Sequence, residues 1–187
     1  MVENTNKGYN MVQKIQVSSD TLYQFLLEHG VKLNRLSEFM GLSQSSFISC
    51  FTHQMLQTGK RRTFTHKTVI RLNSALEQMA DALRSSVLTF GSEQTYTNQW
   101  GNTYDPALLE PMKELGKLVN LTALVERVLG WNKFKKQAVF VAKNSNSYGC
   151  ISQDDVNRVN AELLAIAGVL SSYEVVLDDI PESKCHN

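Results

Sequence analysis

The second half of the sequence can be laid over the first, and this internal repeat restricts the possible folds more than any other feature. With a shift of 87 residues, seven positions between 63 and 90 are identical to their counterparts. Unrelated segments of that length would share about one or two. The identical pairs are Val69 and Val156, Arg71 and Arg158, Asn73 and Asn160, Leu76 and Leu163, Ala80 and Ala167, Leu83 and Leu170, and Ser85 and Ser172. A shift of 89 residues aligns Gly41 with Gly130. The sequence therefore predicts two copies of one small unit.

Apolar residues recur at helical spacing through most of the chain, which predicts a mainly helical fold. In the first half this spacing predicts three short helices over 20–29, 33–40 and 43–51 and a longer one over 69–83. β-type residues predict short strands at 12–17, 87–90 and 173–177, and we hypothesise that these meet in one small sheet.

Changes in composition predict the boundaries of the two units. Residues 1–18 are predicted to form an arm that includes a short strand, and residues 19–91 are predicted to form the first unit. Residues 92–104 are rich in Gly, Asn and Thr and read as a linker. The second unit covers 105–180, opening with Asp105 as N-cap and Pro106 at the first helical position, and 181–187 form a tail.

The segment Leu33–Phe51 has the spacing of two packed helices joined by a tight turn. Leu36, Met40 and Phe47 are expected inside, and Ser37 is the small residue where the helices approach. Ser43 is expected to cap the second helix of the pair. Gly41 is expected at the turn with positive φ, where a side chain would cost about 1 kcal/mol.

This segment resembles the helix-turn-helix domains of the phage lambda repressor and Cro class, most closely in the run Phe39-Met-Gly-Leu-Ser-Gln-Ser-Ser. The resemblance covers about residues 19–84 and continues weakly through Gly59-Lys60. Together with the internal repeat, it implies two tandem lambda-repressor-like helical domains, and the β-type residues at 87–90 and 173–177 predict that each ends in a short strand. It also implies sequence-specific binding of duplex DNA by a homodimer that regulates transcription or a mobile element.

The family's base-reading positions can be carried onto the start of the third helix. The resemblance places Gln44 and Ser45 at base edges in the major groove, where a Gln side chain can pair with N6 and N7 of adenine. Ser46 and Ser49 are expected on or near the same exposed face.

The family's phosphate contacts are matched less well. Where the family places a polar side chain at the start of the preceding helix, this chain has Leu33, with Asn34 and Arg35 beside it. The cluster Lys60, Arg61 and Arg62 is expected to hold phosphates, in a loop longer than is usual for the family.

The second copy departs further from the family. It has Lys133-Phe-Lys-Lys where the first copy has Gln44-Ser-Ser-Phe, and its later part carries Asp154, Asp155, Asp178 and Asp179. We therefore expect it to have a structural or dimerising role.

The charge distribution leaves an alternative open. Residues 1–91 carry ten Lys and Arg against six Asp and Glu, giving +4, whereas residues 92–187 carry nine against twelve, giving −3. An excess of four is small for a nucleic-acid-binding protein. The rival hypothesis is a protein-protein interaction module that keeps the helical fold without binding DNA.

Other classes of function find little support in the sequence. No phosphate loop, dinucleotide-binding, zinc-protease or serine-hydrolase motif occurs, so we expect no enzymatic activity, cofactor or small-molecule ligand. The three cysteines are far apart, which predicts neither a disulfide framework nor a metal site. The longest apolar stretch, 163–170, is far shorter than a membrane span, and we expect a cytoplasmic protein.

Overall fold

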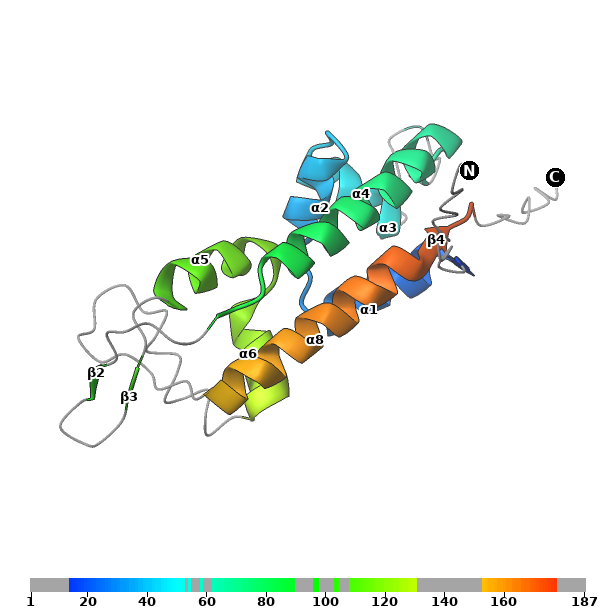
Figure 1. Cartoon of the computed structure of the whole chain (residues 1–187). Helices are drawn as coiled ribbons and strands as arrows, with labels where there is room; N and C mark the ends of the chain where they lie inside the picture. The colour runs from blue at the N-terminus through cyan, green and yellow to red at the C-terminus, as the bar shows by residue number, and fades with distance from the viewer. Residues whose placement is uncertain are drawn as a thin grey trace, which may run out of the picture.

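The computed structural model describes residues 14–52, 54, 58, 62–89, 96–97, 103–104, 108–130 and 153–177, and these are mainly helical as predicted. The first half contains β1 (Ile15–Val17), α1 (Ser19–Glu28), α2 (Leu33–Phe39), α3 (Gln44–Phe51) and α4 (His66–Ser85). The second half contains β2 (Tyr96–Thr97), β3 (Thr103–Tyr104), α5 (Leu109–Leu118), α6 (Leu121–Leu129), α8 (Gln153–Ser172) and β4 (Tyr173–Val175). Figure 1 shows the two long helices α4 and α8 side by side.

Short polar side chains begin several of these helices by accepting hydrogen bonds from the first free backbone N–H groups. The Ser18 hydroxyl accepts from Thr21 N at 3.1 Å, and the Ser43 hydroxyl accepts from Ser46 N at 3.3 Å. Thr65 and Thr68 form a reciprocal capping box at the start of α4, and Asn120 caps α6.

Two glycines end helices in corresponding places of the two halves. Gly41 follows α2 with φ of 66° and Gly130 follows α6 with φ of 85°. A Cβ atom added at either position would meet nothing within 4 Å, so the positive φ alone requires glycine there. These are the two residues that the sequence shift of 89 aligned, and the predicted turn geometry of Gly41 is confirmed.

Helices α4 and α8 pack against each other and supply much of the core. Both are 20 residues long. Their facing sides bury a row of apolar residues: Leu72, Leu76, Met79 and Leu83 from α4, and Val159, Leu163, Ile166 and Leu170 from α8. Buried residues of both halves belong to one continuous hydrophobic core, so the two predicted units share their interior in the described part of the chain.

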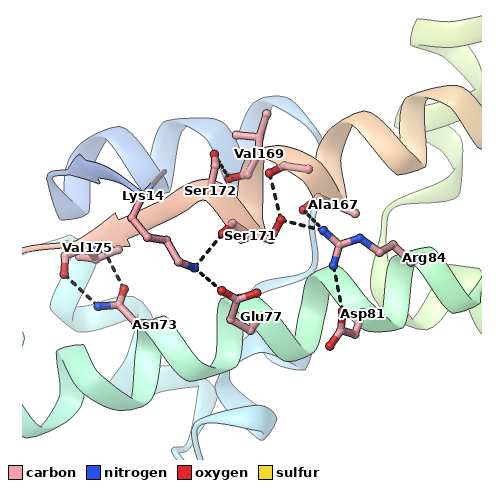
Figure 2. A network of polar contacts seen from close by, with 11 residues as sticks. Lys14, Asn73, Glu77, Asp81, Arg84, Ala167, Val169, Ser171, Ser172 and Val175 are labelled. Atoms are coloured by element: carbon pink, nitrogen blue, oxygen red, sulfur yellow. Dashed lines mark hydrogen bonds and ion pairs between the residues drawn. The ribbon is translucent and has the colours of Figure 1, made fainter. Parts of the chain in front are cut away.

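A polar network seals one edge of the α4–α8 contact (Figure 2). The Arg84 guanidinium donates to the Asp81 carboxylate at 2.9 Å on its own helix and to the Ser171 hydroxyl at 2.7 Å on α8. Lys14, just before β1, donates to the Ser171 carbonyl at 2.8 Å and also pairs with Glu77. The network therefore ties the start of β1 to both long helices.

Each long helix also holds the backbone that follows the other one. The Asn73 amide on α4 donates to the Val175 carbonyl at 3.1 Å and accepts from Val175 N at 2.8 Å (Figure 2). The Asn160 amide on α8 makes the same two bonds with Leu88, both at 2.7 Å. Asn73 and Asn160 are 87 residues apart, and so are Leu88 and Val175. The two contacts are therefore equivalent: each half uses the same asparagine position to bind the same backbone position of the other half.

A second reciprocal contact joins residues 30–32 to residues 118–120, which we call the seam. Val31 and Val119 form an antiparallel bridge. Lys32 N donates to the Leu118 carbonyl at 2.8 Å, and Asn120 N donates to the Gly30 carbonyl at 2.7 Å. A shift of 88 residues exchanges these two hydrogen bonds. The seam thus brings the start of α2 next to the start of α6.

Strands play a small part, and one strand prediction is wrong. β1 pairs in parallel with β4, with Ile15 opposite Tyr173 and Val17 opposite Val175, as predicted for two of the three strands. Residues 87–89, the described part of the third predicted strand, are irregular: no described strand pairs with them, and the Asn160 amide binds the N–H and C=O of Leu88.

Within the predicted linker, β2 and β3 form a short antiparallel ladder that the sequence did not indicate. The predicted helix start at Asp105 and Pro106 lies outside the described residues. Among the described helices, none is both long and apolar enough to cross a membrane.

Candidate nucleic-acid interface

The pair α2 and α3 is built around the residues that the spacing placed inside. Leu36 and Phe47 are 0% exposed and Met40 is 3% exposed. Ser37 is buried between the helices, where its hydroxyl donates to the Asn34 carbonyl at 2.7 Å and its carbonyl accepts from Leu42 N at 2.9 Å. The small side chain allows the close helix contact, so the local geometry agrees with the predicted helix pair.

Aromatic rings fix α3 to the rest of the first half. Phe47 and Phe51 meet edge to face with ring centroids 4.9 Å apart, and Phe64 contacts both rings. Tyr23 of α1 stacks on Phe51 at 4.9 Å. Two rings on the inward face of α3 thus pack against two rings from outside this helix, and this packing fixes the orientation of its outward face.

The first turn of α3 is open and carries no acidic residue. Gln44 and Ser45 are exposed. The Ser43 hydroxyl that caps the helix lies 3.4 Å from the Ser45 hydroxyl. The partial positive charge of a helix N-terminus is therefore unopposed by a carboxylate of this turn, and an amide and a hydroxyl stand beside it.

Ser49 is a correction to the predicted interface, because it is only 3% exposed. By helical spacing it lies near the face of Ser45, but the chain after α3 folds back over it. The Arg62 guanidinium donates to the Ser49 hydroxyl at 2.9 Å, and that hydroxyl donates to the Ser46 carbonyl at 2.9 Å. Ser46 itself is half-buried. The open face of α3 is thus limited to its first turn, and Arg62 is hydrogen-bonded to α3.

At the start of α2, the two polar residues next to Leu33 differ in exposure and in their contacts. Asn34 is exposed, whereas Arg35 is half-buried and fixed. The Arg35 guanidinium lies over the Phe39 ring at 4.6 Å from its centroid and donates to the Glu38 carboxylate at 2.7 Å. Arg35 is therefore partly neutralised by a neighbour on its own helix.

Several predicted contacts lie outside the described residues. These are Lys60 and Arg61; the lysines of 133–136, in the second copy, lie outside the described residues too. Asp154 is exposed on α8, and Asp155 is buried at 3% exposure, so only the first of these two carboxylates lies on the surface.

Cys50, the cysteine in the described residues, is buried. Its burial raises the pKa of the thiol, and the nearby Arg62 guanidinium lowers it by a smaller amount. The thiol stays protonated at neutral pH, so it behaves as a small apolar residue and not as a nucleophile. In the described part of the chain no three His, Cys, Asp or Glu residues are grouped as a metal site would require.

Sequence reasoning missed the residues that join the two halves. The repeat aligned Asn73 with Asn160, which was a usable signal, but it assigned them no contact. Nothing local in the sequence singled out Lys32, Lys113 or Lys117, which the seam brings to one groove. No family model, curated protein or solved structure matches the chain.

Proposed function

We propose that the chain binds duplex DNA through the first turn of α3 and acts as a regulator of transcription or of a mobile element. One observation carries this proposal: Gln44 and Ser45 are exposed at the start of a helix that follows a glycine turn and packs on a buried core, as the predicted helix pair requires. A Gln side chain in this position can form two hydrogen bonds with adenine in the major groove. The Gln44 amide and the Ser45 hydroxyl would then read the base sequence, and Asn34 would lie near the sugar-phosphate backbone of the DNA.

We also propose that the two halves are two lambda-repressor-like units, 19–91 and 105–180, related by duplication. The reciprocal contacts of Asn73 and Asn160, and those of the seam, support this, because contacts exchanged by a nearly constant shift are expected from two related copies. In this view the second half supports the first as a partner subunit would. The homodimer stays a prediction.

The alternative of an interaction module without DNA binding is favoured by one specific observation. Arg62, the described member of the predicted phosphate-binding cluster, is engaged with Ser49 on α3. At least one of its hydrogen-bond donors is therefore already used within the chain.

Salt dependence separates the two functions. We expect the full chain to bind a fluorescent duplex of mixed sequence at about 50 mM salt, and to lose affinity steeply toward about 200 mM as counterions are no longer released favourably. Fluorescence anisotropy measured over that range gives the slope of log affinity against log salt. Absence of binding at the lowest salt would leave the interaction module as the function.

Gln44→Ala tests the base-reading role. After selection of a preferred duplex from a random pool, the variant should discriminate between that duplex and one changed at the adenine less well by about 1 to 3 kcal/mol, or about 5- to 150-fold. Gln78→Ala is the matched control, since Gln78 is an exposed glutamine on α4. If the Gln44 variant ranks the duplexes as the unmodified chain does, Gln44 reads no base.

A further inference from the structure

The seam forms one wall of a groove between the two halves, with a volume of about 600 Å³. The start of α2 lines one side, and the end of α5 and the start of α6 line the other. Pockets of several hundred Å³ are of the size that small ligands occupy. Because both halves contribute to this seam groove, a ligand there would contact both.

The charged residues that line the seam groove are mostly cationic: Lys32, Arg35, Lys113 and Lys117 against the single carboxylate of Glu38. These four cations come from two segments that lie far apart in the sequence, the start of α2 and α5. Fold geometry alone assembles them, and like charges gathered around a hollow favour an anion in it.

Ion pairs around the seam groove hold its cations weakly. Lys113 pairs with Glu110 at 2.7 Å and Lys117 with Glu114 at 2.5 Å. All four side chains are more than half exposed, and such pairs contribute little. The hydrogen bond from Lys113 lowers the pKa of the Glu110 carboxyl. Within the described part of the chain Lys32 makes no ion pair.

Backbone and amide groups add to this positive environment. α6 begins in the seam groove, with Asn120, Leu121 and Thr122 among the lining residues. The Asn120 side chain accepts from Ala123 N at 3.3 Å, which leaves the N–H groups of the first two helical residues without an intrahelical partner. No acidic residue stands in the first turn of α6. The helix dipole therefore adds to the attraction of an anion.

One guanidinium in the seam groove is already oriented. Arg35 is held by the Phe39 ring beneath it and by Glu38 beside it. A fixed guanidinium loses less conformational freedom when it binds an oxyanion than a mobile one does. Planar guanidinium groups and several ammonium groups together are the typical ligands of phosphate.

We propose that the seam groove is a binding site for a phosphate group, held by Lys113 and Lys117 on one side and by Lys32 and Arg35 on the other. A phosphate there bridges the two halves across the seam. The phosphate belongs either to the backbone of the bound duplex or to a free phosphorylated compound. In the first case the site rests on the proposed DNA binding, and in the second it does not.

Pyrophosphate is a suitable probe, and the full chain is the suitable protein. We compare the unmodified chain with Lys113→Gln/Lys117→Gln by isothermal titration calorimetry. The control is Lys67→Gln/Arg71→Gln, which removes the same charge from exposed positions on α4. We expect the groove variant to bind pyrophosphate at least about tenfold more weakly, because two charge-assisted contacts are lost, and the control to change by less than about twofold. Circular dichroism checks that all three chains are folded.

Two results would overturn the site: no binding of pyrophosphate by the unmodified chain, or an equal loss in both variants. A duplex arm identifies the source of the phosphate. If pyrophosphate displaces the duplex and the groove variant binds DNA more weakly, the phosphate is that of the backbone. If the groove variant loses pyrophosphate binding but keeps its affinity for DNA, the phosphate belongs to a free compound. A chain that binds pyrophosphate but no duplex would refute the proposed function and leave the site standing.

Discussion

Replacing Phe47 by alanine is expected to lower the free energy of unfolding by about 3 to 5 kcal/mol, the usual cost of removing a buried aromatic ring. The Phe47 side chain is 0% exposed, and its ring contacts those of Phe51 and Phe64. The cavity would open directly beneath the first turn of α3, where collapse is limited by the rigid rings around it. Urea denaturation followed by circular dichroism measures the loss.

Phe39→Ala is the matched control for this change. Phe39 is half-buried at the end of α2, and the Arg35 guanidinium lies over its ring. Its replacement should therefore lower the free energy of unfolding clearly less than Phe47→Ala does. A loss below about 1 kcal/mol for Phe47→Ala would show that α3 is not anchored through this ring.

Alanine at Asn73 and at Asn160 should give two similar losses of stability. Each amide satisfies one N–H and one C=O of a half-buried backbone segment, and leaving such groups without partners costs about 1 to 3 kcal/mol. The two contacts share no partner, so the double variant should lose nearly the sum, about 2 to 6 kcal/mol. Thermal and urea unfolding of the three variants measure these changes.

Asn157→Ala provides the comparison for these variants. Asn157 is exposed on α8 and its amide contacts only Gln153 among the described residues, so its removal should change stability by less than about 0.5 kcal/mol. A large loss of stability in Asn160→Ala with no loss in Asn73→Ala would contradict the equivalence of the two halves.

Local patterns were sufficient to predict most helices of the first half. The Ser43 cap, the Gly41 turn and the apolar positions Leu36 and Phe47 are all interactions within a few residues, and the structure confirms each of them. Periodicity also placed Leu76 and Leu163 inside, because one face of each long helix is buried against the other.

Errors arose where distant residues decide the local environment. Ser49 was expected to be open, but a guanidinium 13 residues later in the chain covers it. Residues 87–89 have β-type side chains, yet a strand needs a neighbouring strand, and none of the described strands pairs with them. The seam groove could not be predicted because its lysines become neighbours only when residues 30–32 meet residues 118–120.

The exchange of contacts between Asn73 and Asn160 has a consequence for cooperativity. If the first half opens, α4 withdraws the amide that holds the backbone at Val175; if the second opens, α8 withdraws the one that holds Leu88. Neither half can open while its neighbour keeps all its hydrogen bonds, so we expect the two halves to unfold together in one cooperative transition, without a separate stability for each half.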